Sequence, residues 1–285
     1  MFGPRKQDAL ASRSDALVAL GDAIDHDKDK KLKLRSSELA IVPSPGGRSA
    51  WAFDVIDVEG EPHAVTAILV NTDDIWQVDT VLVAHMPARG LVKSELAKDA
   101  VVPPAADAKA KIDATARPAV ERFQKGLLDQ DAWGEDLAAH TDAVVVGPTV
   151  GEVARGKKEI KKLFKKRGDA KMRAAMSGEI TAGATPDGQL AWVTAPITRA
   201  ADKEDPTPLR AFAVYEHTDT GWTMIALHES LALDAPGSGA SFKKTVPPAP
   251  AEEKPEEPPK KKEASKDAKD SKKKPASKKK KKRSL

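Results

Sequence analysis

The sequence contains no cysteine, and this absence excludes disulfides, a thiolate nucleophile and any metal site built on cysteine. Long apolar runs are also absent: the longest, residues 64–70, is interrupted by Thr66 and is far shorter than the roughly 18 residues that span a bilayer. The first ten residues, MFGPRKQDAL, lack the apolar segment of a secretory signal. We therefore expect a soluble chain without a transmembrane segment, and a cytoplasmic location for the chain as written.

Charge is divided unevenly along the chain. Residues 236–285 carry 17 Lys/Arg against 7 Asp/Glu, whereas residues 1–235 carry 30 against 36. The overall charge of +4 thus combines an acidic body with a basic C-terminal segment. A segment so rich in Pro, Lys and Glu cannot bury a core, so we expect a disordered tail over residues 236–285. No aromatic residue interrupts its lysine blocks, which favours weak, salt-sensitive contact with a polyanion and excludes base stacking.

Three strand-like runs, residues 190–199, 209–217 and 222–231, form the most regular part of the chain. They are rich in Ala, Val, Thr and aromatic residues, and turn residues separate them, which predicts an antiparallel meander. Before the meander, apolar periodicity predicts further elements. These are helices over residues 117–128 and 131–140, a strand over 142–147, and a helix over 157–167. The whole pattern is typical of an α+β fold.

The same pattern recurs in the first half of the chain, at offsets of 141 to 146 residues. The matching landmarks are Pro4 with Pro148, Trp51 with Trp192, Trp76 with Trp222, and the two VPPA segments at residues 102–105 and 246–249. Four landmarks with one slowly drifting offset predict a duplicated domain.

The second copy resembles the SnoaL-like branch of the nuclear transport factor 2-like family, which has a cone fold. The motifs that carry the resemblance are Val146-Gly147-Pro148, the helix start at residues 154–160, Ala191-Trp192-Val193, and Gly221-Trp222 followed by His228 and Ser230. It covers about residues 115–233 and, more weakly, 1–92. The resemblance implies a curved antiparallel sheet that wraps helices around a conical pocket. The family includes isomerases, polyketide cyclases, dehydratases and non-enzymatic binding or dimerisation modules.

We therefore expect two tandem α+β cone-fold domains. The first, truncated copy is predicted at residues 1–92, a linker at 93–111, the complete SnoaL-like copy at 112–235, and the tail after it. Nothing in the first copy matches the helices over residues 117–140, so we expect either a start upstream of Met1, with room for an export signal, or another segment in their place. Without such cover, apolar residues around Trp51, Ile68 and Trp76 would face water.

Alternation along the last strand predicts that Trp222, Met224, Ala226, His228 and Ser230 share one face. The resemblance implies that this face lines the pocket. His228 and Ser230 would lie about 7 Å apart, which is too far for a nucleophile–base pair. The only carboxylates that the pattern places near a pocket mouth are Glu135 and Asp136. The pocket-lining candidates are Trp133, Trp192, Phe212, Tyr215, Trp222, His228 and Ser230.

No catalytic residue, cofactor or metal site is predicted, and three functions remain open. The preferred one is a non-catalytic module that binds a small apolar ligand in the second domain. The second is an enzyme of the cyclase, isomerase or dehydratase kind in that domain. The third is a structural unit, either a homodimer or an intramolecular pair of domains, in which sheet faces pack on each other as in family dimers.

Overall fold

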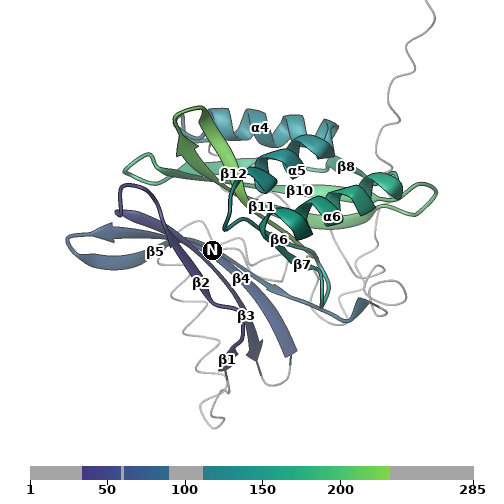
Figure 1. Cartoon of the computed structure of the whole chain (residues 1–285), viewed down its shortest axis with the longest axis horizontal. Coiled ribbons are helices and arrows are strands. Elements are labelled where there is room, and N and C mark those ends of the chain that lie inside the picture. Colours follow the sequence, from purple (N-terminus) through teal and green to yellow (C-terminus); the bar gives the residue numbers. More distant parts are fainter. Residues whose placement is uncertain (1–33, 59–60, 90–111, 232–285) are drawn as a thin grey trace, which may run out of the picture. The chain divides into compact units, whose positions relative to one another are not determined.

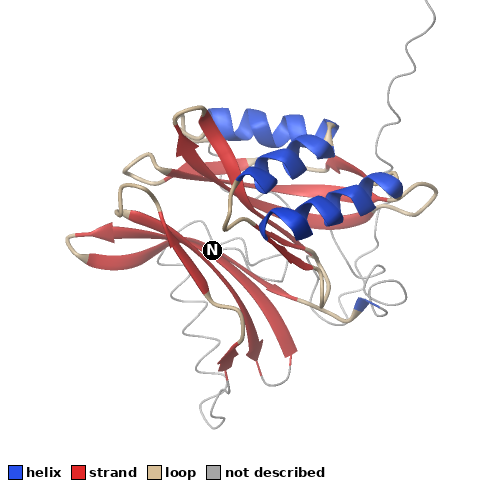
Figure 2. Cartoon of the chain, viewed as in Figure 1, coloured by secondary structure: helices blue, strands red, loops and turns tan. Residues whose placement is uncertain are grey.

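The computed structural model of the protein describes residues 34–58, 61–89 and 112–231. These residues form a five-stranded N-terminal sheet, the helices α4–α6 and a seven-stranded C-terminal sheet (Figures 1 and 2). The helical periodicity after Pro4, the predicted linker over residues 93–111 and the predicted tail over residues 236–285 lie outside the described residues.

The N-terminal sheet is antiparallel, with strand order β1-β3-β4-β5 and with β2 also paired to β3. Its strands are β1 (Leu34–Ser36), β2 (Ala40–Pro43), β3 (Ser49–Val58), β4 (Glu61–Thr72) and β5 (Ile75–His85). Asp73 and Asp74 join β4 to β5 with φ of 52° and 62°. Two consecutive positive φ values characterise the tight hairpin turn that matches the twist of the flanking strands.

The C-terminal domain begins with α4 (Arg117–Leu128) and α5 (Gln130–Ala139), and its sheet has the order β7-β6-β12-β11-β10-β8, with β9 also paired to β10. The remaining elements are β6 (Val144–Val146), β7 (Val153–Arg155), α6 (Gly156–Asp169), β8 (Arg173–Met176), β9 (Thr181–Ala184), β10 (Leu190–Ala200), β11 (Thr207–Thr218) and β12 (Gly221–Ser230). The predicted helices and the meander are confirmed, with ends that shift by a few residues. Within the described residues, no helix is both long and apolar enough to cross a membrane.

Local interactions fix where these helices begin and how closely they approach. The Asp129 carboxylate accepts a hydrogen bond from the Asp131 backbone N–H and caps α5. Gly126 of α4 faces Trp133 of α5, and a Cβ at residue 126 would lie 1.8 Å from the indole ring. Only glycine therefore allows α4 and α5 to pack with Trp133 between them.

The two faces of the C-terminal sheet have different partners. We call the face covered by α4, α5 and α6 the inner face; in Figure 2 all three helices lie on this one side of the sheet. The opposite, outer face packs against the N-terminal sheet in a second apolar cluster. That cluster joins Trp51, Phe53, Ala64, Ile68, Leu82 and Met86 to Val144, Val146, Leu190, Phe212, Val214, Ile225 and Ala226.

A β-bulge in the last strand changes which side chains reach each face. Val214 pairs with Ala226 while Tyr215 pairs with Met224, so Ile225 is an extra residue in β12. Trp222 and Met224 belong to the inner-face core, whereas Ala226 belongs to the outer-face cluster. The expectation that the residues from Trp222 to Ser230 alternate on one face is therefore wrong.

The N-terminal sheet repeats the arrangement of strands β8 to β12. Both β1 and β2 pair with β3, just as both β8 and β9 pair with β10. Each sheet has a Trp on the strand that leads into its hairpin: Trp51 lies opposite Ile68, and Trp192 lies opposite Val214. A register shift follows Ile68 in one sheet and Val214 in the other.

Packing between the two sheets buries apolar residues of the N-terminal sheet that would face water without a covering segment. Trp51 and Ile68 are 1% and 0% exposed, because they point at the outer face of the C-terminal sheet. The C-terminal sheet thus provides, for these two residues, the cover that the missing helices would otherwise have to supply. Trp76, near the start of β5, remains 47% exposed.

Candidate functional site

The most polar part of the inner face is a buried group of three charges. Glu229 comes from β12, Arg167 from the last turn of α6, and Arg199 from the end of β10. One carboxylate oxygen of Glu229 accepts hydrogen bonds from both guanidinium groups. The Glu229 side chain is fully buried, and those of Arg167 and Arg199 are 6% and 13% exposed.

The two guanidinium groups and the one carboxylate have a net charge of +1. Burial by itself would raise the pKa of Glu229, but the charges of Arg167 and Arg199 hold that pKa below its ordinary value. Glu229 is therefore ionised at neutral pH. Burial lowers the pKa of Arg167, although a guanidinium still keeps its proton.

A second polar group lies where Tyr215 points at the helices. Arg122 of α4 holds Asp136 of α5 through two hydrogen bonds of 3.1 and 2.7 Å. Burial raises the pKa of the Tyr215 phenol well above its ordinary value, and the nearby charge of Asp136 adds to the effect. Tyr215 is thus a neutral hydroxyl that can donate a hydrogen bond. Of the two predicted carboxylates, Asp136 is held in this ion pair and Glu135 is exposed.

The two polar groups are separated by small apolar side chains. Glu229 lies opposite Ala211 on β11, which is four residues, or about 13 Å, from Tyr215. Between them the inner face presents Ala211, Ala213, Val193 and Ala195. We call these four buried side chains the apolar floor, and the two polar groups lie at its ends.

Several buried polar atoms at these two ends have no hydrogen-bond partner in the part of the chain that the structure describes. They are the Tyr215 hydroxyl, Nη1 of Arg167 and Oε1 of Glu229. Buried polar atoms in native proteins nearly always have a partner, and each exception calls for an explanation.

The seven pocket-lining candidates divide between the two faces. Trp133, Tyr215 and Trp222 belong to the inner-face core, whereas Trp192, Phe212, His228 and Ser230 lie on the outer side. Trp133 is fixed in the core by a hydrogen bond that its indole N–H donates to the backbone carbonyl of Phe123. Trp192 and Phe212 stack with their ring centroids 6.2 Å apart.

His228 lies between the two sheets. Its Nδ1 is 3.0 Å from the hydroxyl of Thr66, on β4 of the N-terminal sheet. Burial lowers the pKa of His228 to about 3, although the charge of Glu229 opposes the shift. His228 is therefore a neutral residue of the sheet interface and does not reach the inner face.

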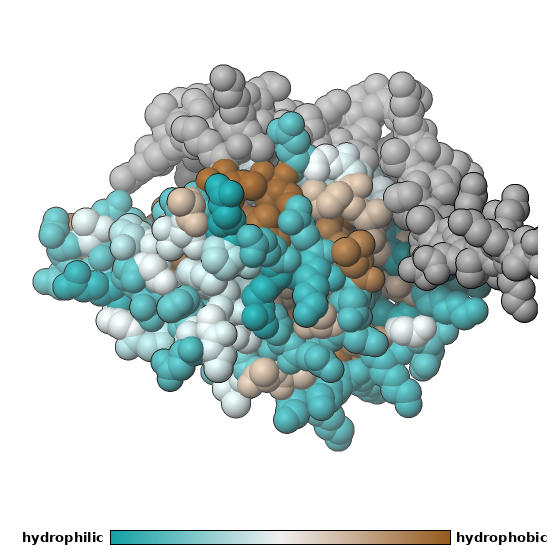
Figure 3. Space-filling model, turned by 90° about the horizontal axis from the view of Figure 1, so that it is seen from above, coloured by the Kyte–Doolittle hydropathy of each residue, from teal (hydrophilic) through white to brown (hydrophobic). Residues whose placement is uncertain are grey.

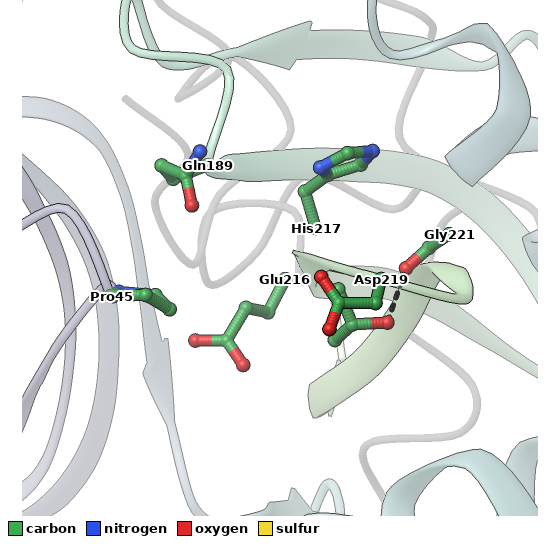
Figure 4. Close-up of a pocket in the computed structure, with 7 residues that line it drawn as sticks. Pro45, Gln189, Glu216, His217, Asp219 and Gly221 are labelled. Atoms are coloured by element: carbon green, nitrogen blue, oxygen red, sulfur yellow. Dashed lines mark hydrogen bonds between the residues drawn. The ribbon is translucent and has the colours of Figure 1, made fainter.

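A separate recess lies at the ends of the strands, with a volume of about 710 Å³ (Figure 4). It is lined by Pro45, Gln189, Glu216, His217, Thr218, Asp219 and Gly221. None of the predicted pocket residues lines it. Its buried carboxylate, Glu216, lies 3.4 Å from Nε2 of His140, and among the described residues no three His, Asp or Glu side chains are grouped to hold a metal ion.

Sequence reasoning missed Arg167, Arg199 and Glu229. A signal for Arg167 was present, because it lies on the same helical stripe as the buried Ile160 and Phe164. Glu229 was overlooked because alternation without the bulge assigns it to the opposite face.

Comparison with known proteins identifies the C-terminal domain. Residues 129–234 match the sequence model of the SnoaL-like domain, so the chain contains a SnoaL-like domain there; the match does not extend to the N-terminal sheet. No curated protein matches the chain.

The solved structures that are similar to this chain include the following three, each of which covers less than half of its length. An NTF2-like protein of unknown function from Pseudomonas putida KT2440 has 18% identity and a TM-score of 0.35, with 46% of this chain and 93% of that one covered. An NTF2-like superfamily protein from Salmonella enterica has 16% identity and a TM-score of 0.34, with 44% and 93% covered. An uncharacterised protein with a cystatin-like fold from Caulobacter vibrioides has 13% identity and a TM-score of 0.34, with 41% and 87% covered.

Proposed function

We propose that the SnoaL-like domain binds a small, mainly apolar molecule at its inner face and performs no chemistry on it. The observation that carries this proposal is the set of unpartnered buried atoms on Tyr215, Arg167 and Glu229, at the two ends of an apolar floor. A domain whose inner face served only as a core would be more stable with apolar side chains at these positions. Polar groups kept there at a cost in stability are typical of a binding site.

The protonation states of the same groups argue against the enzyme alternative. A general base works best when its pKa lies near the working pH. The pKa of Glu229 is held low by two guanidinium groups, Asp136 is paired with Arg122, and Tyr215 keeps its proton. His228, which was predicted to line the pocket, lies on the outer face. Among the described residues at the apolar floor, Glu229 is thus a weak base, Asp136 is held in an ion pair and Tyr215 is a hydrogen-bond donor.

Tyr215→Phe tests the proposal, because it removes the hydroxyl and keeps the ring. We expect the ligand-free variant to be more stable than the parent by about 1–3 kcal/mol, since an unpartnered buried hydroxyl costs about this much. Native mass spectrometry should show that the variant retains less of any small molecule that co-purifies with the parent protein. Denaturant unfolding measures the stability.

The matched control is Thr80→Val, which removes a buried hydroxyl from the N-terminal sheet that is hydrogen-bonded to Asp79. It should lower stability and leave ligand retention unchanged. A Tyr215→Phe variant that is destabilised and retains ligand like the parent would show that the hydroxyl has only a structural purpose.

We propose in addition that the N-terminal sheet is a second, shortened copy of the C-terminal one and acts as its built-in partner. The similar strand order and the register shift after Ile68 in one sheet and after Val214 in the other support a common origin. The outer-face cluster supports the partner function, because the N-terminal sheet buries Phe212, Val214 and Ile225. On this view the chain makes within itself the sheet-to-sheet contact that a dimer would otherwise supply, so we expect a monomer.

Ile68→Val tests whether the two sheets form one cooperative unit. Ile68 is fully buried between them, so loss of one methylene should lower stability by about 0.5–1.5 kcal/mol. The free energy of opening measured by amide hydrogen exchange should fall by the same amount in β4 and in β11. The control, Ile41→Val on the 56%-exposed side chain of β2, should change neither. Faster exchange in β4 alone would mean that the sheets unfold independently.

A further inference from the structure

Helix α6 exposes a dense row of positive charge that neither the core nor the proposed ligand site uses. Six lysines between residues 157 and 166 are all exposed, while Ile160, Phe164 and Arg167 on the opposite side are buried. We call these six the lysine face: Lys157, Lys158, Lys161, Lys162, Lys165 and Lys166. Figure 1 shows α6 running beside α5 on the helical side of the domain.

This charge is concentrated on one element of an otherwise acidic domain. Residues 156–169 hold seven Lys/Arg and two Asp/Glu, whereas the rest of residues 112–231 hold nine and 16. Figure 3, which views the molecule from the helical side, shows a mainly hydrophilic surface with a few hydrophobic patches. A domain that keeps a net positive helix on a net negative body presents a directional field to an anionic partner.

The lysine face is not neutralised by its own domain. Among the ion pairs within the described residues, none involves any of the six lysines. The nearest carboxylate in sequence, Glu159, accepts a hydrogen bond from the backbone N–H of Arg155 at the helix start. Six like charges within ten residues repel one another, a cost that a polyanion would relieve.

The spacing of the lysines suits an extended polyanion. They form two rows with a four-residue repeat, which places one charge about every 6 Å along the helix. The first and last lysines are nine residues apart, or about 14 Å. A small anion would reach one or two of them, whereas a phosphate backbone can contact a whole row.

We propose that the lysine face of α6 binds the phosphate backbone of a nucleic acid without sequence preference. The exposed residues of the face are lysines, which act as point charges and lack the forked geometry that arginine uses for bidentate recognition of bases. A membrane surface is disfavoured, because the apolar side of α6 is buried in the domain, so that a bilayer could hold this helix by charge alone. The basic C-terminal segment, residues 236–285, would add to the same attraction.

The test compares two triple variants of the full-length chain. Lys157→Gln, Lys161→Gln and Lys165→Gln remove one row, and Arg117→Gln, Lys125→Gln and Lys203→Gln remove as many exposed charges elsewhere in the domain. Binding to short fluorescent DNA duplexes of two unrelated sequences is measured by anisotropy between about 50 and 200 mM salt. The logarithm of the association constant falls as the logarithm of the salt concentration rises. We expect this negative slope to be smaller in magnitude by about 2 to 3 in the row variant, since each lost phosphate contact contributes about 0.9.

The control variant should keep the slope of the parent, and both duplexes should behave alike. The proposal would be overturned if the two triple variants had equal effects, or if the row variant showed the same salt dependence of DNA binding as the parent. Binding of the parent to phosphatidylserine vesicles without binding to DNA would also overturn it. Circular dichroism of each variant establishes that α6 is still folded.

Discussion

Glu229→Gln is expected to lower the free energy of unfolding by about 3–5 kcal/mol, although it changes a single atom type in the side chain. The carboxylate is fully buried and is the acceptor for both Arg167 and Arg199. Its neutralisation would leave two guanidinium groups close together with no opposite charge between them. A buried charge that loses its partner costs more than the pair contributed, because the remaining group cannot return to water.

Urea unfolding of Glu229→Gln beside Glu135→Gln measures this effect. Glu135 is an exposed residue of α5, so its substitution should change stability by less than about 0.5 kcal/mol. Adding Arg167→Met to Glu229→Gln should recover part of the loss, because it removes one of the two uncompensated charges. A loss below about 1 kcal/mol for Glu229→Gln would mean that water or a rearrangement compensates the arginines, and that the inner face is not a closed environment.

Mild acid is expected to destabilise the protein through His228. In the unfolded chain its pKa is about 6.5, whereas burial between the sheets lowers the folded pKa to about 3. Below pH 6.5 the unfolded chain therefore binds a proton that the folded protein does not. The stability due to neutral His228 is complete above pH 6.5 and declines by about 1.4 kcal/mol per pH unit as the pH falls toward 3.

The comparison of parent, His228→Gln and His217→Gln isolates this contribution. His217 is an exposed histidine of β11 and serves as the matched control. Free energies of unfolding between pH 7 and pH 5 should fall by about 2 kcal/mol in the parent and remain nearly flat in His228→Gln. Glu229 stays ionised between pH 7 and pH 5, because its pKa lies below its ordinary value of about 4.5. Its protonation therefore does not contribute to the change in stability over this pH range. A parent that is equally stable at pH 7 and pH 5 would contradict the burial of His228 between the sheets.

The elements of the C-terminal domain could be predicted from sequence because their signals are local. Arg117 and Leu128 bound α4 as the apolar spacing predicts, and the turn residues Asp219 and Thr220 separate β11 from β12. Pairing of strands in sequence order then follows from short loops. The strands β3, β4 and β5 of the N-terminal sheet also pair in sequence order.

Side-chain placement on β12 could not be predicted, because one extra residue reverses every later position. The bulge at Ile225 has no glycine or other local marker, so alternation carried His228 and Ser230 to the wrong face. The same residue shift turned Glu229 inward to meet Arg167 and Arg199. This meeting joins residues up to 62 positions apart, which is a tertiary contact that no local pattern records.

A crystal structure of the protein purified from its native host would show whether the inner face of the SnoaL-like domain binds a small molecule. We predict electron density for a small molecule over Ala211 and Ala213, within hydrogen-bond distance of the Tyr215 hydroxyl at one end and of Arg167 Nη1 or Glu229 Oε1 at the other. Native mass spectrometry of the same sample should give a matching mass. The proposed binding site would be contradicted if protein side chains filled the inner face, these atoms were hydrogen-bonded to one another, and no molecule co-purified.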